Sequence, residues 1–263
     1  MITAGIDVGS LTAKAIVYDS GEDRVVGRSL VSLTHDPAQA GHLALAQALA
    51  EAGLTQNQVA ASTATGYGRI ALQFATYRIT EISCHARGVH HLLPSVRTVV
   101  DVGGQDSKVT RLDEAGRALD FEMNDRCAAG TGRFLEVMAG ALGVDLTGLS
   151  DLALSSASPA SLSSTCTVFA ESEVVGLLAQ GRAREDLAAG LCLAVARRVA
   201  AMTQRLGLEP EVAFTGGVAL NEGVRAALVE VLGVPVTVPP DPQLTGALGA
   251  ALLAWEKSVA EGT

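Results

Sequence analysis

Asp101-Val-Gly-Gly-Gln-Asp106 is the stretch that decides the fold, because it places a glycine turn directly after a short apolar run at 97–102. The apolar run predicts a buried strand, and glycines without a Cβ let the backbone bend sharply and approach a charged group. Asp101 could hold a hydrated divalent metal, and Gln105 could orient a water for attack on a terminal phosphoryl group. The stretch therefore predicts a phosphate-binding turn.

A second copy of this pattern lies near the N-terminus, at Asp7-Val-Gly-Ser-Leu-Thr-Ala-Lys14. One offset pairs Asp7 with Asp101, Val8 with Val102, Gly9 with Gly103, Lys14 with Lys108 and Asp19 with Asp113. Each copy predicts a strand, a glycine turn and a second strand, so the chain is expected to form two related halves that clamp a nucleotide between them. The alternative is two ordinary hairpin turns that are alike by chance.

Composition narrows the class of protein. A chain of 263 residues is long enough for two domains of moderate size, which the repeat favours. A formal charge of -9 and a pI of about 5.0 argue against nucleic acid as the main partner, because phosphate backbones need clustered Lys and Arg. The first residues lack the pattern of a secretory signal, and the most apolar late run, 247–255, is too short to span a bilayer. We expect a cytoplasmic protein without membrane contact.

Hydrophobic periodicity and turn residues place the remaining elements. Strands are expected at 24–33, 58–64, 118–123 and 211–214, and helices at 37–53, 80–93, 167–181, 185–206 and 244–257. A further helix, ending at Gly143, is expected after Cys127 and the Ala-Ala-Gly-Thr-Gly that follows it, with the cysteine at or just before the helix start. A Ser-rich loop at 155–165 leads to Cys166 at the start of the next helix. We expect one domain at 1–95, with the closing helix 244–263 packed back onto it, and a second at 96–243 that carries both cysteines.

Four cysteines in a chain of this kind do not indicate a disulfide framework. Cys127 and Cys166 are each expected at a helix start, where the backbone amides lower the pKa of a thiol and favour an anionic cluster. Two thiols make half of a four-thiolate site, so the economical solution is a twofold axis with both cysteines supplied by each of two subunits. The spacing leaves open the alternative of two unrelated buried thiols. Cys192 is expected in the core.

The motifs resemble a known family. The two phosphate hairpins, the adenosine turn Thr215-Gly-Gly217 and the closing glycine helix are similar to the ATPase superfamily of sugar kinases, heat-shock chaperones and actin. Within it, Asn124-Asp-Arg-Cys-Ala-Ala-Gly-Thr-Gly-Arg-Phe134 and Ser164-Thr-Cys-Thr-Val-Phe-Ala-Glu-Ser-Glu173 resemble the activator ATPases (component A) of 2-hydroxyacyl-CoA dehydratases, of the BadF/BadG/BcrA/BcrD type. The likeness covers nearly the whole chain. It implies an α/β fold of two related actin-like, ribonuclease H-like domains with a nucleotide cleft between them.

The resemblance also implies cofactors and partners. It implies a homodimer with one 4Fe-4S cluster at the subunit interface, ligated by the residues that match Cys127 and Cys166. Each subunit is expected to bind ATP or ADP with Mg. A reduced ferredoxin or flavodoxin is the expected electron donor. ATP hydrolysis would drive a domain rearrangement, and the electron would pass at very low potential to a separate 2-hydroxyacyl-CoA dehydratase or related reductase.

The expected site residues fall into groups by role. Asp7 and Asp101 are expected to hold Mg through water, and Gln105 to position the attacking water. Phosphate contacts are expected from Gly9, Ser10, Thr12, Lys14, Gly103 and Gly104. Nucleoside contacts are expected from Gly216, Gly217, Asn221 and Gln243. Glu171 and Glu173 either sense the nucleotide cleft or are solvated helix charges.

Three other functions compete with the activator. A small-molecule kinase of the same superfamily would have no use for two thiols at helix starts and would be colourless. An iron-sulfur carrier that binds nucleotide only for regulation would hydrolyse no ATP. An ATPase subunit of a benzoyl-CoA reductase or of a double-cubane-cluster reductase system could hold its cluster between two different chains.

Overall fold

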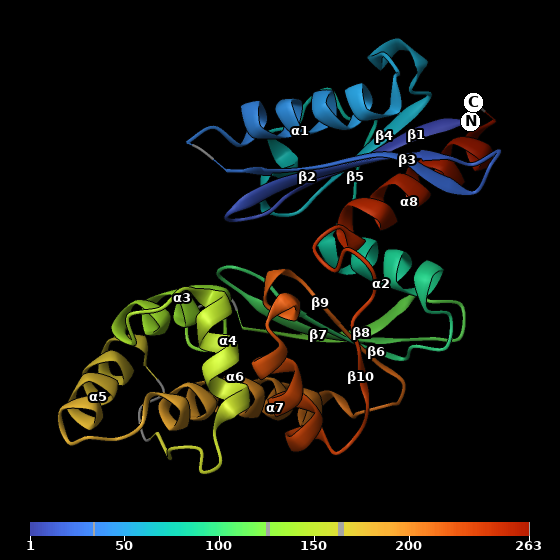
Figure 1. The fold of residues 1–263 in the computed structure, drawn as a ribbon. Helices are drawn as coiled ribbons and strands as arrows, with labels where there is room; N and C mark the ends of the chain where they lie inside the picture. The colour runs from blue at the N-terminus through green and yellow to red at the C-terminus, as the bar shows by residue number, and fades with distance from the viewer. Residues whose placement is uncertain (34, 125–126, 163–165, 263) are drawn as a thin grey trace. The chain divides into compact units, whose positions relative to one another are not determined.

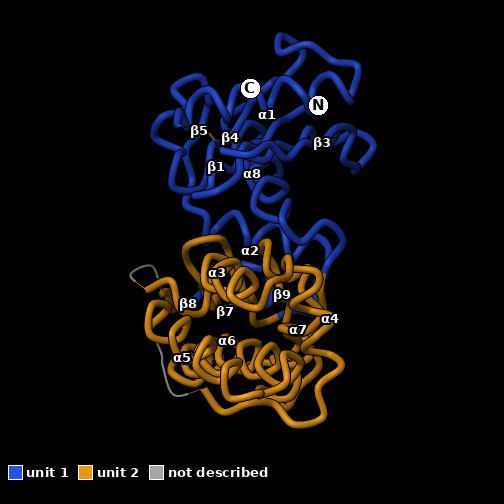
Figure 2. Tube along the Cα trace, turned by 60° about the vertical axis from the view of Figure 1, so that its left-hand side comes forward, with its two compact units in different colours: residues 1–96, 112–119, 239–263 blue, residues 97–111, 120–238 orange. Residues whose placement is uncertain are grey.

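A computed structural model describes all residues except 34, 125–126, 163–165 and 263. The chain divides into two compact units (Figure 2). Unit 1 comprises Met1–Val96, Leu112–Leu119 and Pro239–Thr263, and unit 2 comprises Arg97–Arg111 and Asp120–Val238. The C-terminal segment therefore belongs to the same unit as the N-terminus.

Unit 1 is built on a five-stranded sheet in the order β3-β2-β1-β4-β5 (Figure 1). Its strands are β1 (Ile2–Val8), β2 (Thr12–Asp19), β3 (Arg24–Ser32), β4 (Ala61–Thr65) and β5 (Tyr77–Arg78). The first three strands pair antiparallel, whereas β4 runs parallel to β1 and β5 runs parallel to β4. Helix α1 (Pro37–Ala52) packs on one face of the sheet and helix α8 (Thr245–Glu261) on the other, with α2 (Glu81–Leu92) against α8.

Glycines set the close approach of α8 to its neighbours. A Cβ on Gly5 of β1 would lie 1.9 Å from the Ala247 carbonyl oxygen, and one on Gly249 would lie 1.7 Å from the Cys84 carbonyl oxygen of α2. Neither position accepts a side chain without separation of the elements, since real Cβ atoms do not approach backbone atoms this closely. The close packing expected of the glycine-bearing closing helix is thus present, within unit 1.

Unit 2 repeats the strand order of unit 1. Its sheet runs β8-β7-β6-β9-β10, with β6 and β7 antiparallel and β6, β9 and β10 parallel. The strands are β6 (Thr98–Val102), β7 (Ser107–Leu112), β8 (Ala118–Asn124), β9 (Val212–Thr215) and β10 (Val236–Thr237). The helices are α3 (Gly132–Ala141), α4 (Leu146–Ser155), α5 (Thr167–Ala179), α6 (Arg184–Leu206) and α7 (Glu222–Leu232). Helix α6 is the most buried and carries Cys192 into the core.

Three features differ from the sequence-based expectation. The strand expected at 58–64 begins at Ala61, because Gln56–Gln58 forms a 3-10 turn. Helices α4 and α7 are additional to the expected elements. Helix α3 begins at Gly132, at the end of the Ala-Ala-Gly-Thr-Gly segment as expected, but Cys127 is not at or just before its start, because Gly130 has a φ of +88° and Thr131 is extended. By contrast, α5 begins directly after Cys166, as expected.

Within the described residues, no single helix has both the length and the apolar composition needed to cross a membrane. The pair α3 and α4 meets those criteria only when taken together, and it is bent by 78°.

Candidate functional site

The two glycine hairpins match in register as well as in sequence. In unit 1, Asp7 pairs with Lys14 across the antiparallel strands, and in unit 2, Asp101 pairs with Lys108. Each turn is closed at its first glycine: the Gly9 amide donates to the Thr12 carbonyl at 3.0 Å, and the Gly103 amide donates to the Asp106 carbonyl at 2.9 Å. The sequence repeat therefore corresponds to a structural repeat, and chance likeness is excluded as its explanation.

A threonine-glycine pair extends this repeat. Thr65 at the end of β4 lies beside Asp7, and Thr215 at the end of β9 lies beside Asp101. Each threonine is followed by a glycine with positive φ, Gly66 at +79° and Gly216 at +85°, and a 3-10 turn then begins at residue 67 or 217. The sequence indicates both turns but does not pair them, because a shared Thr-Gly dipeptide is too short a signal.

Gly66 and Gly216, the glycines of the two Thr-Gly turns, lie so close to the aspartates that a side chain would not fit at either position. A Cβ on Gly66 would lie 2.4 Å from Asp7 Oδ1, and one on Gly216 would lie 3.0 Å from Asp101 Oδ1 and 2.3 Å from the Val102 carbonyl oxygen. Side chains are excluded at both positions, because the glycine backbone packs closely against each carboxylate.

The aspartates are buried and bonded differently. Asp7 is 5% exposed and its Oδ2 lies 3.1 Å from Lys14 Nζ, whereas Asp101 is 8% exposed and its Oδ1 accepts a 2.8 Å hydrogen bond from Thr215 Oγ1. In unit 2, Lys108 forms an ion pair with Asp106 of the turn. Each unit thus provides a carboxylate, an ammonium group and a glycine turn, which together suit a metal-bound phosphate.

The other expected nucleotide contacts lie in both units. Gln105 is exposed, and the backbone of Gly103 and Gly104 beside it is partly exposed. Asn221 caps α7, accepting from the Val224 amide at 3.0 Å and donating to the Leu146 carbonyl at 3.2 Å, so its side chain already has a structural role. Gln243 precedes α8 in unit 1, and the turn with Gly216 and Gly217 belongs to unit 2.

The turn of unit 2 is hydrogen-bonded to the start of α3. The Gly132 amide donates to the Gly103 carbonyl and the Arg133 amide to the Gly104 carbonyl, both at 2.8 Å. The residue before them, Thr131, donates through its hydroxyl to the Ala128 carbonyl at 2.6 Å. The turn is therefore joined to the segment at 128–131 by consecutive hydrogen bonds.

The loop that carries Cys127 is held at the other end by Asn124. The Asn124 Nδ2 group donates to the Cys127 carbonyl at 2.9 Å and to the Ala129 carbonyl at 3.2 Å. Residues 125–126 of this motif lie outside the described residues. Cys127 thus lies five residues before α3, and not at or just before the N-terminus of that helix as expected.

The four thiols form two classes. Cys84 and Cys192 are buried, and burial raises the pKa of each to about 12, so neither is a ready thiolate ligand. Cys127 is half-buried, and Cys166 is exposed as the N-cap of α5. Over the described parts of the chain, no three His, Cys, Asp or Glu side chains gather closely enough to hold a metal ion. A four-thiolate cluster fits this chain only if a second chain completes it.

Two sheets of identical strand order, each with an aspartate, a glycine turn and a Thr-Gly turn, define the actin-like, ribonuclease H-like class of nucleotide-binding proteins, which confirms the expected fold. The chain belongs to the BadF/BadG/BcrA/BcrD ATPase family, which matches residues 4–254.

Relatives of this chain cover nearly its whole length. It is 47% identical over 256 residues to the activator of lactoyl-CoA dehydratase from Anaerotignum propionicum, covering 97% of this chain and 98% of that protein. It is 32% identical to one of the benzoyl-CoA reductase subunits from Thauera aromatica, covering 95% and 92%. The structure of the activator of the 2-hydroxyisocaproyl-CoA dehydratase from Clostridium difficile with bound ADPNP has a TM-score of 0.93 and 42% identity, covering 100% of this chain and 97% of that one.

Proposed function

We propose that the protein is a cytoplasmic ATP-dependent activator of a 2-hydroxyacyl-CoA dehydratase, passing low-potential electrons through one 4Fe-4S cluster shared by two identical subunits. The names and identities of its relatives support the activator role. The observation that carries the proposal is the direct hydrogen bonding between the Gly103-Gly104 turn and the start of α3, which follows Cys127 by five residues.

The nucleotide is proposed to use both hairpins. Asp7 and Asp101 orient waters on Mg, and Gln105, the exposed residue of its turn, positions the attacking water. Phosphate contacts are assigned to Gly9, Ser10, Thr12, Lys14, Gly103 and Gly104. Nucleoside contacts are assigned to Gly216, Gly217 and Gln243, with Asn221 fixing the adjoining helix α7.

Coupling is proposed to run through the backbone of unit 2. A phosphate held by the turn fixes the Gly103 and Gly104 carbonyls, and these accept the first amides of α3. A shift of α3 moves Thr131 and, through Ala128, the loop of Cys127. The loop is proposed to adopt two arrangements, and if these differ in nucleotide affinity, ATP binding selects one of them. A bound 4Fe-4S cluster supplies one-electron transfer at low potential.

The second cysteine lies beside an apolar surface suited to a second copy of the chain. Helix α5 starts at Cys166 and exposes Val168 (67%), Phe169 (68%) and Val175 (52%). Burying such residues against an identical helix is favourable and brings two Cys166 residues toward one axis. Glu171 on this helix is exposed, in keeping with a solvated charge.

Anaerobic reconstitution with iron and sulfide tests the proposal. The expected product is a brown dimer with about four irons per two chains, loaded by reduced ferredoxin or flavodoxin. Cys127→Ser and Cys166→Ser should each abolish the colour, whereas Cys192→Ala, a matched control at a buried thiol, should keep it. Colourless wild-type protein that phosphorylates a small molecule would instead assign a kinase.

The relative at 32% identity favours a second candidate, an ATPase subunit of a benzoyl-CoA reductase or double-cubane-cluster reductase system. Here the cluster would join two different chains. The mass of the iron-loaded assembly separates the two: an iron-loaded homodimer supports the dehydratase activator, and an iron-free monomer that gains iron only with a second chain supports the reductase component.

A further inference from the structure

Arg69 joins the Thr-Gly turn of unit 1 to helix α2. It belongs to the 3-10 turn Tyr67–Ile70, which directly follows Gly66. Its Nη1 group donates to the Gly66 carbonyl oxygen at 2.9 Å and to Oε2 of Glu81, the first residue of α2, at 3.3 Å. One guanidinium group therefore connects two segments that β5 separates in the chain.

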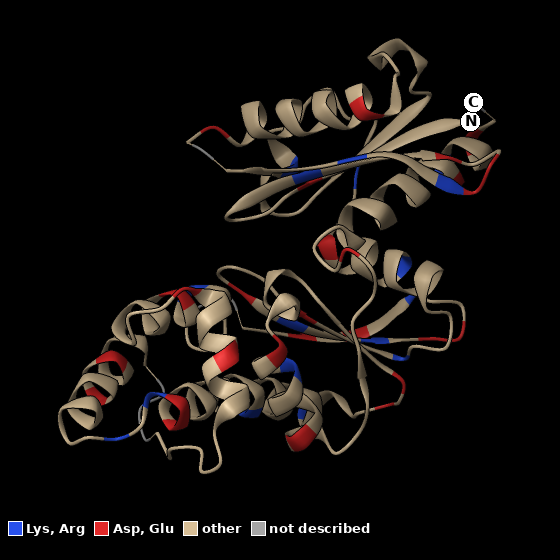
Figure 3. Cartoon of the chain, viewed as in Figure 1, with Lys and Arg blue, Asp and Glu red and all other residues tan. Residues whose placement is uncertain are grey.

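This ion pair is largely withdrawn from solvent. Acidic and basic residues are interspersed over the helices and strands (Figure 3), and pairs such as Arg24 with Glu22 are exposed. By contrast, the Arg69 side chain is 28% exposed and the Glu81 side chain 15% exposed. A partly buried pair is screened less by water and salt than an exposed one, so it holds its partners more firmly.

The carbonyl that Arg69 holds belongs to the glycine that packs against Asp7. A Cβ on Gly66 would lie 2.4 Å from both Asp7 Oδ1 and the Val8 carbonyl oxygen. The other oxygen of the aspartate, Oδ2, lies 3.1 Å from Lys14 Nζ. One carboxylate oxygen is thus fixed by an ammonium group and the other is limited by the Gly66 backbone, so a movement of this turn changes the space around Oδ1.

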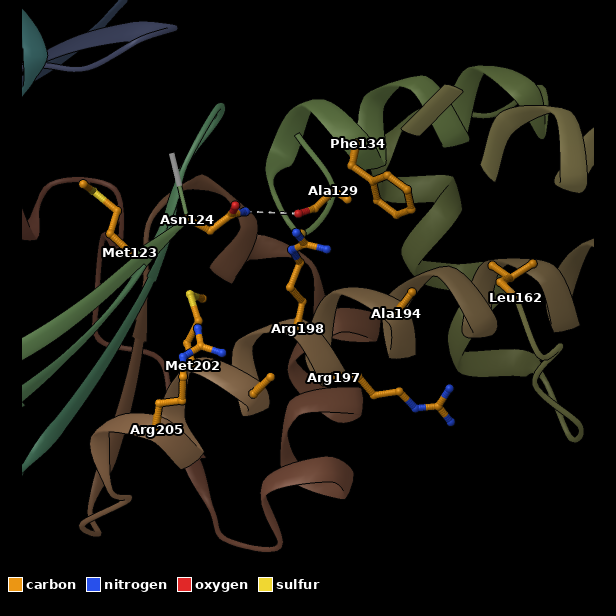
Figure 4. Close-up of a pocket in the computed structure, with 12 residues that line it drawn as sticks. Met123, Asn124, Ala129, Phe134, Leu162, Ala194, Arg197, Arg198, Met202 and Arg205 are labelled. Carbon is orange, nitrogen blue, oxygen red and sulfur yellow. Dashed lines mark hydrogen bonds between the residues drawn. The ribbon is translucent and has the colours of Figure 1, made fainter. Parts of the chain in front are cut away.

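The guanidinium group at this position is particular to unit 1. In both units the third residue of the 3-10 turn donates its amide to the carbonyl of the preceding glycine at 3.3 Å, and this residue is Arg69 in unit 1 and Ala219 in unit 2. The alanine methyl group makes no hydrogen bond. Figure 4 shows an arginine of unit 2 in a different place, since Arg198 extends from α6 toward Ala129 in the loop of Cys127.

Unit 2 restrains its turn by another bond. There the Thr215 hydroxyl donates to Asp101 at 2.8 Å, which ties the Thr-Gly turn directly to the strand-end carboxylate. The Thr65 hydroxyl of unit 1 has no partner of hydrogen-bond geometry among the described residues. Arg69 therefore supplies, from the far side of the turn, a restraint that unit 2 obtains from its threonine.

We propose that Arg69 is a positioning residue for the Mg-nucleotide site of unit 1, where it holds the Gly66 turn against Asp7 while Glu81 orients the guanidinium group. The inference rests on the proposed role of Asp7, a carboxylate that orients waters on Mg. Groups that orient a metal-binding side chain without touching the metal affect its affinity, and their loss typically weakens metal binding by about 10- to 100-fold. Because Arg69 acts through one backbone carbonyl, we expect the lower end of this range.

Calorimetric titration of the full-length protein with ADPNP at a series of Mg concentrations tests the proposal. Arg69→Gln should raise the Mg concentration needed for half-maximal enhancement of ADPNP affinity by about 10-fold. The affinity measured without Mg should stay unchanged, because Arg69 is not assigned to the phosphates or the nucleoside. Arg87→Gln is the matched control: it breaks an ion pair of similar burial within unit 1, with Glu256, and should leave the Mg dependence unchanged.

Conservative variants show whether the two residues act as one unit. Arg69→Lys keeps the charge but not the planar fork that reaches two acceptors, so it should raise the required Mg concentration by only about 3-fold. Glu81→Gln should have an effect of similar size. Combining it with Arg69→Gln should be no worse than Arg69→Gln alone, because Glu81 acts through the guanidinium group.

Asp7→Asn separates this proposal from the one on which it rests. If Asp7→Asn raises the required Mg concentration and Arg69→Gln does not, the positioning role is overturned while the assignment of Asp7 stands. An Asp7→Asn variant with the wild-type Mg dependence would overturn both. Equal changes in Arg69→Gln and Arg87→Gln would indicate a general loosening of unit 1 and would also overturn the positioning role. If Arg69→Gln does not fold, Arg69→Lys and Glu81→Gln decide the question.

Discussion

The two units share one strand order but differ in the crossover between their third and fourth strands. Unit 1 connects β3 to β4 through the single long helix α1 and a short 3-10 turn, whereas unit 2 connects β8 to β9 through α3, α4, α5 and α6. Cys127 and Cys166 both lie in the longer crossover. The comparison teaches that the glycine hairpin is common to both units, while Cys127 and Cys166 belong to an extended crossover that only unit 2 has.

A finer difference lies at the strand ends. In unit 1 the lysine of the hairpin bonds the strand-end aspartate, Asp7, and in unit 2 the equivalent aspartate, Asp101, accepts from Thr215. The equivalent threonine of unit 1, Thr65, has a buried hydroxyl with no partner of hydrogen-bond geometry among the described residues, and it lies near the Cys84 sulfur, a weak acceptor. The two units therefore share the backbone of the hairpin but differ in the bond between the threonine hydroxyl and the strand-end aspartate.

The largest effect expected from this difference between the units is on the rate of ATP hydrolysis. Asp101→Asn should lower the rate of ATP hydrolysis by about 10³-fold, because it removes a carboxylate that is proposed to hold the hydrated Mg at the reacting phosphate. Steady-state phosphate release measures the change. Asp113→Asn, in the exposed β7–β8 turn, is the control with an unchanged rate. An Asp101 variant that hydrolyses ATP at the wild-type rate would show that Asp101 takes no part in the hydrolysis.

The next effect concerns stability in unit 1. Lys14→Met should lower the free energy of unfolding by about 3 kcal/mol, because Asp7 is left buried without its ion pair. Urea denaturation measures it. Arg225→Gln breaks an exposed pair with Glu222 and should cost under about 0.5 kcal/mol. Equal costs for the two variants would show that the Lys14 pair is not desolvated.

The threonines test the asymmetry directly. Thr215→Val should cost about 2 kcal/mol, because the hydroxyl donates to a buried carboxylate, whereas Thr65→Val should change the unfolding free energy by under about 0.5 kcal/mol. Both variants keep the β-branched shape, so packing is matched. The two sites would be energetically equivalent if both substitutions proved costly.

A last effect appears only at alkaline pH and is small at neutral pH. Burial raises the pKa of Cys84 in unit 1 and Cys192 in unit 2 to about 12 from 9.0, so the folded state keeps both thiols neutral while the unfolded state ionises above pH 9. Their contribution is complete below pH 9 and is lost between pH 9 and 12, by at most about 1.4 kcal/mol per pH unit for each thiol. Urea midpoints of Cys192→Ala should fall less steeply over this range than those of the wild type. A parallel decline would assign the alkaline loss to other groups.

The sequence is informative where a signal is local. The hairpin repeat and the start of α5 at Cys166 follow from residues adjacent in the chain, and both are present. The start of α3 agrees with the prediction, but the separation of Cys127 from it does not, because Gly130 adopts a positive φ that the apolar stripe of the helix does not indicate. The equivalence of Thr65 and Thr215 escapes sequence reasoning, because it is recognisable only once β4 is placed beside β1 and β9 beside β6.

The multi-helix crossover also bears on how such a protein can be altered. Because the crossover leaves the sheet at β8 and returns to it at β9, the two units keep the same hairpin register although their crossovers differ in length. A graft that exchanges 125–206 for a single helical span of the α1 type would separate nucleotide handling from thiol chemistry in one polypeptide. Unit 1 makes this connection with a single α-helix, whereas unit 2 uses the same connection for the segment that carries Cys127 and Cys166.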